Sequence, residues 1–304
     1  MDPWAQIDEA RAVGRAVTEG GIDHIRGQAL VQVRRSMGMT GAPPAPCADP
    51  AIAYVHPDSV VRRIHGDLPS MLIGGLSALL FQMLHPLAMA GVAQHSNYRA
   101  DPLGRLERTA GFLGTTTFGT RDEARDAIER VRRIHSGVRG TAADGRPYSA
   151  GDPGLLTWVH AAEVSSFLAA TRVYAPVRPT AAEEDDYLAQ MARVALALGA
   201  ADVPRSRADL DAYFVEVRPR LRMTPDARTA RNFVLRGVGR WPHEIATYGL
   251  LVTAAQGVLP PWARRQLRLP ALPAGDLLAV RPSARLLGSA FRWVVAQPVR
   301  PERA

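Results

Sequence analysis

Residues 68–98 read LPSMLIGGLSALLFQMLHPLAMAGVAQHSNY and contain no Asp, Glu, Lys or Arg. The stretch is long enough to span a bilayer, but prolines, glycines, glutamines and histidines interrupt it. We therefore expect helices buried on all sides inside one protein core, and no integral membrane span. Only His85 and His95 in this stretch carry side chains that titrate near neutral pH.

The overall composition favours a helical protein that does not bind nucleic acid. The chain has 304 residues, of which 47% are hydrophobic, 22% charged and only 6% aromatic. Its net charge of +8 comes from arginine alone, because the sequence contains no lysine. The absence of lysine excludes P-loop and Schiff-base chemistry. The arginines are spread along the chain rather than clustered with aromatic residues, which is typical of charge on helix surfaces.

Helix-capping signals recur at the spacing of an all-α protein. Thr120-Arg-Asp-Glu123 and Thr180-Ala-Ala-Glu183 are capping boxes, and Asp152-Pro153 is an N-cap followed by proline. We expect an N-terminal helical arm and Pro-rich loop over 1–57 and one large helical domain over 58–304. The predicted helices are 8–17, 22–36, 58–66, 69–84, 86–96, 102–114, 121–139, 153–174, 181–198, 207–218, 225–238, 243–256 and 276–296, with loops at 37–57, 140–152, 175–180 and 257–275.

The single cysteine and the N-terminal residues favour a cytoplasmic location. Cys47 alone excludes an internal disulfide and a C-x-x-C-H haem attachment. The first residues, MDPWAQIDEARAVGRAV, lack the basic segment and following apolar segment of a signal peptide. The apolar helix near the C-terminus, around Leu286, Phe291 and Val295, could form an interface, but the oligomeric state is not predicted.

One histidine lies on the apolar face of a strongly charged helix. Ile128, Val131, His135 and Val138 follow each other at steps of three and four, so they share the face that we expect to be buried. A neutral histidine there needs hydrogen-bond partners, since each buried unmet group costs about 1–3 kcal/mol. His135 is either a core residue bonded to backbone carbonyls or a ligand.

Three further histidines lie in apolar surroundings. His160 shares a helix face with Glu163, an arrangement found both in metal sites and in inert pairs on helix surfaces. His85 and His95 are ten residues apart and could approach one cavity only if Pro86 bends the chain. The alternative interpretation is structural, with His85 as a helix-end residue that bonds to backbone and His95 as a partner of Ser96 or Asn97.

Haem b is the cofactor that these residues suit best. No spacing of histidines and carboxylates typical of a non-haem metal site occurs, nor does a Gly-x-Ser-x-Gly hydrolase motif. A haem needs one axial histidine, an apolar slot and cations for its two carboxylates. Arginines near helix ends, such as Arg139, could supply those cations.

The chain resembles a known oxygenase family in an ordered set of motifs. The resemblance covers roughly residues 58–260 and is to the MpaB-like oxygenases, also known as the rubber-oxygenase (latex-clearing protein) catalytic domain. The motifs that carry it are DSVVRRIHGD (58–67), LLFQMLHPLAMAGVAQHS (79–96), DPLGRLERTAGFLGTTTFG (101–119), RRIHSGVRG (132–140) and GRPYSAGDPGLLTWVHA (145–161). It implies an all-helical fold with a globin-like core around haem b, and cleavage of carbon–carbon double bonds in isoprenoid chains.

The resemblance also implies roles for individual residues. His135 matches the proximal haem ligand, with His160 as the fallback, and Arg105 and Thr109 match the distal arginine and threonine of the rubber-cleaving branch. We expect Arg105 and Arg108 to hold haem propionates or polarise bound oxygen, and Thr109 to bond to the distal ligand or to water. Arg139 is also expected to bind the cofactor, while His85 or His95 would face the distal pocket.

Two departures from the rubber-cleaving branch bear on the mechanism. Arg108 stands where that branch has a lysine that can ligate the iron, and arginine cannot do so. The branch also uses a distal glutamate, whereas no carboxylate occurs here between Asp67 and Asp101.

We therefore expect a haem b-dependent oxygenase that uses dioxygen or a peroxide on a hydrophobic, alkene- or isoprenoid-like small molecule. The alternatives are a haem-dependent hydroxylase or peroxidase-like enzyme, and a haem-free helical protein that binds a lipid.

Overall fold

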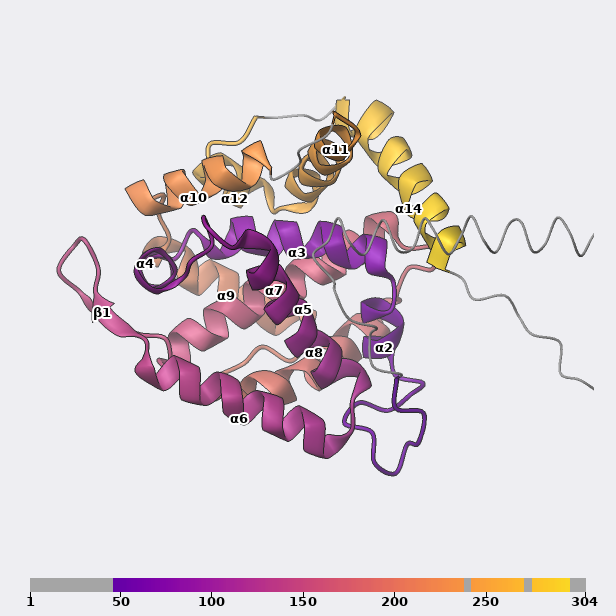
Figure 1. Cartoon of the computed structure of the whole chain (residues 1–304), viewed down its shortest axis with the longest axis horizontal. Helices are drawn as coiled ribbons and strands as arrows, with labels where there is room; N and C mark the ends of the chain where they lie inside the picture. Colours follow the sequence, from indigo (N-terminus) through magenta and orange to yellow (C-terminus); the bar gives the residue numbers. More distant parts are fainter. Residues whose placement is uncertain (1–45, 238–241, 271–274, 296–304) are drawn as a thin grey trace, which may run out of the picture.

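The computed structural model describes residues 46–237, 242–270 and 275–295 and confirms the all-α prediction (Figure 1). The predicted helices 8–17 and 22–36 lie outside these residues. The division of the chain at residue 57, and the likeness of its core to a globin, stay predictions. The elements are α2 (Val60–His65), α3 (Leu68–Gln82), α4 (Pro86–His95), α5 (Pro102–Phe118), α6 (Arg121–Gly137), β1 (Arg139–Thr141), β2 (Pro147–Ser149), α7 (Pro153–Tyr174), α8 (Ala181–Leu198), α9 (Arg207–Val217), η1 (Arg218–Arg220), α10 (Pro225–Arg236), α11 (Pro242–Val258), α12 (Pro261–Gln266), η2 (Asp276–Val280) and α14 (Arg281–Val295).

Helix α7 is the centre of the bundle and packs most extensively on α3. It begins where the sequence places an N-cap, because the Asp152 side chain accepts a hydrogen bond from the Leu155 backbone N–H. More than half of its residues are buried, so neighbouring helices surround it on several sides. Trp158 of α7 is fully buried and meets the Phe81 ring of α3 edge-on at 5.2 Å between centroids.

The charge-free stretch forms two helices, α3 and α4, that meet at a bend of 105°. Within the described residues, no single helix is long and apolar enough to cross a membrane, although this bent pair passes by length and composition. Met83, Leu84 and His85 are buried at the bend, and Pro86 begins α4. Proline at the bend lacks the N–H that a continuous helix would need.

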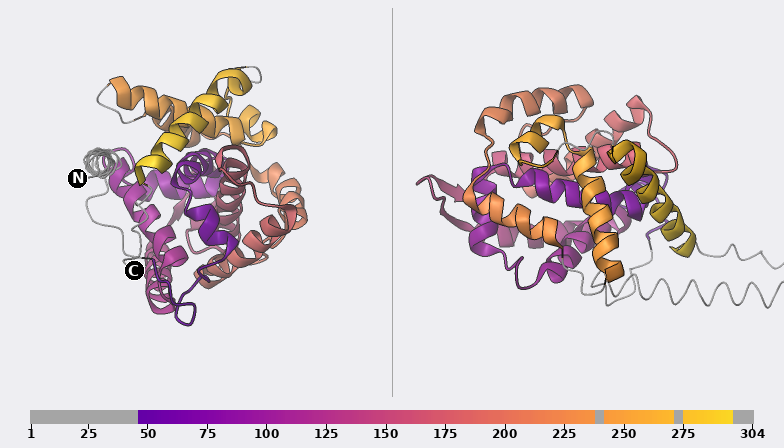
Figure 2. Two further views of the ribbon diagram at one scale, coloured as in Figure 1. Left: turned by 90° about the vertical axis from the view of Figure 1, so that its right-hand side faces the viewer. Right: turned by 90° about the horizontal axis from the view of Figure 1, so that it is seen from above.

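The C-terminal helices cover one side of the bundle. α11 packs on α3 and α7, and α14 packs across α11, α3 and α7 (Figure 2). Arg292 of α14 donates from Nε to Asp67 Oδ1 at 2.6 Å and from Nη2 to the Tyr174 backbone oxygen at 2.9 Å. This largely buried ion pair joins α14 to the residue that precedes α3.

The predicted helix 276–296 begins with the π-helix η2, and the structure differs further from the predicted elements at three places. The predicted loop 140–152 contains a two-stranded antiparallel hairpin in which Gly140 pairs with Tyr148. The predicted loop 257–275 contains α12, which is too short for hydrophobic periodicity to reveal. Helix α5 continues four residues beyond the predicted end at 114, because burial of Thr116 and Thr117 outweighs the weak helix propensity of threonine.

Two adjacent glycines of α3 provide a matched test of this packing. A Cβ at Gly74 would lie 2.8 Å from Phe167 Cδ1 and 3.1 Å from its Cα, whereas a Cβ at Gly75 would meet no atom within 4 Å. We expect Gly74→Ala to lower the free energy of unfolding by about 1–3 kcal/mol through overpacking. Gly75→Ala should leave it unchanged or raise it by up to about 1 kcal/mol through helix propensity. Chemical denaturation measures both, and equal effects would contradict the packing.

Candidate active site

One side of the packed α3–α7 pair carries mainly apolar side chains, which neighbouring helices cover only in part. On α3, Leu72 and Leu79 are half-buried on the same side of the helix as Gly75, whose missing side chain would meet open space. On α7, Val159 and Glu163 are half-buried at a spacing of four residues. Gln82 donates from Nε2 to the Val159 backbone oxygen at 3.4 Å, which places these two half-buried stripes beside each other.

Helices α5 and α6 form a hairpin beside the α3–α7 pair. They are joined by Gly119 and Thr120, and a capping box between Thr120 and Glu123 fixes the start of α6. Figure 1 shows the two helices diverging from this turn, with α5 crossing in front of α7 and α6 running along the lower edge of the molecule. Arg105 lies roughly fourteen residues before the turn, and His135 lies roughly fifteen residues after it. Because both helices rise equally per residue, the two residues lie near the open end of the hairpin.

His135 lies on the inward face of α6, as predicted from the periodicity. Ala124 and Ile128 on this face are buried, and His135 itself is half-buried. Its Nδ1 is buried without a hydrogen-bond partner, and its Nε2 makes no hydrogen bond to any described residue. Burial lowers the pKa of the imidazole, so the ring is neutral and keeps a free lone pair. A neutral imidazole with an uncommitted nitrogen is the form that binds a metal ion.

The three predicted distal residues of α5 differ in their surroundings. Arg105 is half-buried and donates from Nη1 to the Ser96 hydroxyl, while burial and then the neighbouring Arg108 lower its pKa. Arg108 is exposed and pairs with Asp101 at 3.2 Å. Thr109 is exposed, and its hydroxyl donates to the Arg105 backbone oxygen at 3.0 Å. Arg105 is therefore the one of these three that is held partly inside the protein.

His95 and Arg139 connect the end of α4 to the residues that follow α6. His95 is exposed, and its Nε2 lies 3.1 Å from the Arg139 backbone oxygen, to which it donates. The Arg139 side chain is exposed and donates from Nε to the Ser136 backbone oxygen at 3.2 Å. The contact between His95 and Arg139 holds the C-terminal end of α6, where His135 lies, near α4. The predicted roles of His95 and Arg139 toward a cofactor stay predictions.

His85 has a structural role at the bend between α3 and α4. Its Nδ1 accepts a hydrogen bond from the Ala88 backbone N–H at 3.5 Å and so caps α4. Burial, followed by the positive charges of Arg146 and Arg220, lowers the pKa of His85 to about 4. The ring lies 6.1 Å from that of Trp158, on the part of α7 that faces the core. These contacts do not test the predicted catalytic role of His85.

His160 and Glu163 both lie in the interior, one turn apart on α7. His160 is buried, its Nε2 has no hydrogen-bond partner, and burial lowers its pKa to about 4. Glu163 is half-buried, and burial raises its pKa to about 7. The two side chains make no hydrogen bond to each other. Glu163 therefore does not fix the tautomer of His160, as the sequence had suggested that it could.

A buried hydrogen-bonded triad ties together the helices around the site. His65 of α2 lies 2.7 Å from Thr117 Oγ1 of α5 through Nδ1 and 3.0 Å from Tyr187 OH of α8 through Nε2. Glu163 is close enough to raise the pKa of Tyr187 electrostatically, which places Glu163 on the side of α7 that faces α8 and this triad. In the sequence, His65 stands out only as part of the motif DSVVRRIHGD (58–67), although its place after an apolar residue in a short helix indicates burial.

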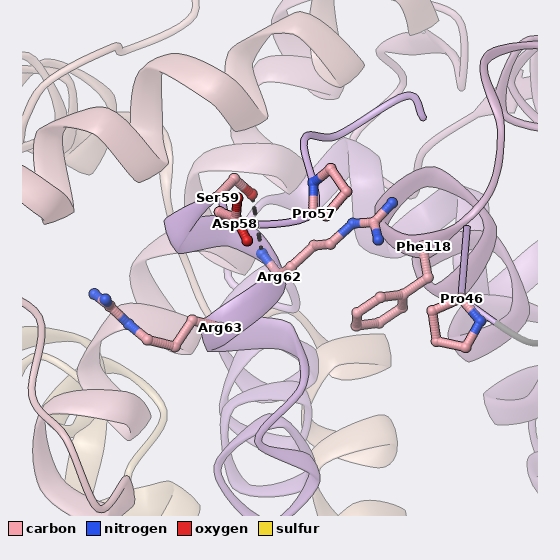
Figure 3. Close-up of a pocket in the computed structure, with 7 residues that line it drawn as sticks. All are labelled: Pro46, Pro57, Asp58, Ser59, Arg62, Arg63 and Phe118. Carbon is pink, nitrogen blue, oxygen red and sulfur yellow. Dashed lines mark hydrogen bonds between the residues drawn. The ribbon is translucent and has the colours of Figure 1, made fainter. Parts of the chain in front are cut away.

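A surface pocket of about 330 Å³ is lined by residues of α2, of the segment before it and of the end of α5 (Figure 3). Arg62 crosses it, donating from Nε to the Thr117 backbone oxygen at 3.1 Å and from Nη1 to the Cys47 backbone oxygen at 2.6 Å. None of the predicted site residues lines it. Its lining residues are Pro46, Pro57, Asp58, Ser59, Arg62, Arg63 and Phe118.

Comparison with known proteins identifies one family. The sequence model described as ER-bound oxygenase mpaB/B'/Rubber oxygenase, catalytic domain, matches residues 62–293, which is more than half of the chain. No curated protein and no solved structure matches.

Proposed function

We propose that this chain, which belongs to the mpaB/rubber oxygenase catalytic-domain family, is an oxygenase that binds haem b and acts on a hydrophobic, alkene-containing small molecule. The observation that carries the proposal is the free imidazole of His135. It stands on the inward face of α6, its ring is neutral, and neither nitrogen is bonded to a described residue.

The residues around His135 fit a haem. The iron needs one protein ligand, and His135 would supply it. Arg105, half-buried at the same end of the α5–α6 hairpin, would pair with a propionate or with bound oxygen. Leu72 and Leu79 would meet the apolar faces of the macrocycle or of the substrate. His160 is the weaker candidate ligand, because it is buried in the core part of α7, where burial alone shifts its pKa and its neighbour Ala161 is fully buried.

When bound, the haem iron would supply the binding and activation of dioxygen or a peroxide. The chain's own residues would exclude water and orient the substrate. The apolar side of α3 would remove bulk water from the reacting groups, and the low dielectric would strengthen the polar contacts that Arg105 makes with the cofactor or bound oxygen. Because Arg108 is an arginine, it stays protonated and would not compete for the iron.

Spectroscopy of the purified protein tests this function. We expect protein produced with adequate iron, or mixed with hemin, to show a Soret band with one haem per chain. With an alkene and dioxygen, we expect two carbonyl products for each double bond cleaved. A hydroxylated product instead would favour the hydroxylase alternative. Protein that is colourless and takes up no hemin would favour the haem-free lipid-binding alternative and overturn the proposal.

A further inference from the structure

Helix α14 is attached to the bundle through its arginine face. Arg292 pairs with Asp67 at 2.6 Å, and Arg285 donates from Nε to the Val173 backbone oxygen at 2.9 Å. Because the two arginines are seven residues apart, they lie on the same face of the helix. The charged face of α14 therefore points toward the end of α7 and toward the residue that precedes α3.

The residues that α14 buries are its smallest. Ala284 and Gly288 are the only buried residues of this helix. A Cβ at Gly288 would lie 3.3 Å from Pro69 Cβ, so α14 closely approaches the start of α3 at this point. The large apolar residues of α14 all keep accessible surface, and they are Leu286, Leu287, Phe291, Trp293, Val294 and Val295.

The outward face of α14 is apolar. Leu286, Ala290 and Trp293 follow each other at steps of four and three, and all are exposed, Leu286 at 74% and Trp293 at 47%. Arg285 is the only charged residue among the exposed residues of this helix. A surface helix normally turns its apolar face inward and its charged face outward. α14 has the opposite orientation and lies at the outer edge of the molecule (Figure 1), so its apolar face is available for docking.

Uncompensated positive charge borders this face. Arg285 is exposed and forms no ion pair with a described carboxylate. Arg178 is also exposed and makes no hydrogen bond or ion pair with a described residue, and it closely follows Tyr174, whose backbone oxygen binds α14. Val177, beside Arg178, is 65% exposed and extends the apolar surface. Asp276, at the first position of η2, is the only acidic residue of η2 and α14.

A lipid surface fits this face better than a second copy of the chain. α14 has 15 residues and is about 22 Å long and about 10 Å wide, so its outward face covers on the order of 200 Å². A stable interface between two proteins buries about 800 Å² on each partner. The net charge of +8 also opposes the association of two copies, whereas it favours an anionic surface.

We propose that the outward face of α14 docks the protein on an anionic lipid surface, with Leu286 and Trp293 inserted among the headgroups and Arg178 and Arg285 beside the lipid phosphates. Leucine and tryptophan on one face of a helix, with arginine at its border, are typical of helices that lie in the plane of a membrane interface. Docking would bring the lipid near the start of α3, whose apolar side faces the substrate in the proposed function. Only this last consequence rests on the oxygenase function proposed above.

Sedimentation with lipid vesicles tests the proposal on the full chain. We expect at least about tenfold tighter binding to vesicles of equal parts phosphatidylcholine and phosphatidylglycerol than to phosphatidylcholine alone, and weaker binding as salt is added. Leu286→Ser should weaken binding to the mixed vesicles at least about tenfold, because it removes the apolar area that enters the lipid. Val215→Ser is the matched control, since Val215 of α9 is 70% exposed, and it should leave the affinity unchanged.

Two further variants separate the electrostatic contribution from the apolar one. Arg178→Gln should weaken binding to the mixed vesicles about fivefold and leave binding to phosphatidylcholine unchanged, because one arginine near an anionic surface contributes about that factor. Tryptophan fluorescence of the unmodified chain should shift to shorter wavelength on the mixed vesicles. Trp293→Phe should remove most of this shift, because Trp293 is the tryptophan that enters the lipid.

The other outcomes would overturn the proposal. Absence of binding to the mixed vesicles would do so, and so would binding that Leu286→Ser leaves unchanged. A chain that does not bind vesicles, but forms a dimer in ultracentrifugation that Leu286→Ser dissociates, would assign the face to a second copy. None of these measurements requires hemin, so the lipid surface and the oxygenase function fail or stand separately.

Discussion

The His135→Ala variant is expected to bind hemin at least about 100-fold more weakly than the unmodified chain and to lose its Soret band at matched concentrations. Loss of a group that merely orients a metal ligand already costs about 10–100-fold, and loss of the ligand itself costs more. The free energy of unfolding should change little, because the imidazole makes no hydrogen bond within the described residues and is only half-buried. Hemin titration followed by absorbance measures the first effect and chemical denaturation the second.

Restoration of the Soret band by added imidazole distinguishes a haem ligand from a residue with a purely structural role. His135→Gly leaves space for an added imidazole, which should restore the Soret band when it takes the position of the missing side chain. His56→Ala is the matched control, since His56 is exposed and is not among the predicted site residues. Full hemin binding by His135→Ala would reject the assignment. The same measurement on His160→Ala would then show whether α7 supplies the ligand.

The helices whose ends are determined by local chemistry were predictable from sequence. α7 and α8 begin at the predicted residues because Asp152 and Thr180 accept hydrogen bonds from the first turns of their helices. α8 also ends as predicted, before Gly199 in the left-handed conformation. The β1–β2 hairpin was missed because each strand has only three residues, and its Tyr148 is buried through a contact with Gln94 of α4 that is distant in sequence. Local patterns do not contain such contacts.

The candidate site was likewise predictable only where it depends on the spacing of residues along one helix. The inward orientation of His135 follows from spacing along α6 alone, and the structure places it so. Whether the Glu163 carboxyl finds a hydrogen-bond partner depends on the residues of α3 and α8 that surround it. Spacing along α7 does not reveal those residues. His65 gains its two partners from α5 and α8, more than fifty residues away in each case. Residues whose role depends on another helix were therefore assigned incompletely.

Acid is expected to destabilise the protein strongly. Burial lowers the pKa of His65 to about 3 and, as the largest cause, lowers that of His85 and His160 to about 4. In the unfolded chain these rings take up protons below a pKa of about 6.5. Between these values the unfolded state binds more protons than the folded state, so stability is present above pH 6.5 and is lost as pH falls toward 4.

The size of this loss is comparable with the stability of a typical domain. Each pKa unit is worth about 1.4 kcal/mol, so each of the three histidines contributes up to about 3 kcal/mol by pH 4. Glu163 opposes them, because its folded pKa of about 7 lies above its unfolded value and its penalty disappears as pH falls. The net loss is on the order of 5 kcal/mol, against a total of about 5–15 kcal/mol for most proteins.

Denaturant unfolding between pH 7.5 and about 4 measures how steeply the free energy of unfolding falls with pH, which is the slope predicted from these proton-binding differences. His65→Gln keeps a side chain that can reach toward Thr117 and Tyr187 but cannot titrate, so its stability should fall less steeply with acid than that of the unmodified chain. A purely structural role for His65 would lower stability equally at every pH and leave the slope unchanged. His56→Gln, at an exposed position, should keep the original slope. A flat profile for the unmodified chain would show that the three rings are not held neutral by burial, and the uncommitted nitrogens of the interior would then need another explanation.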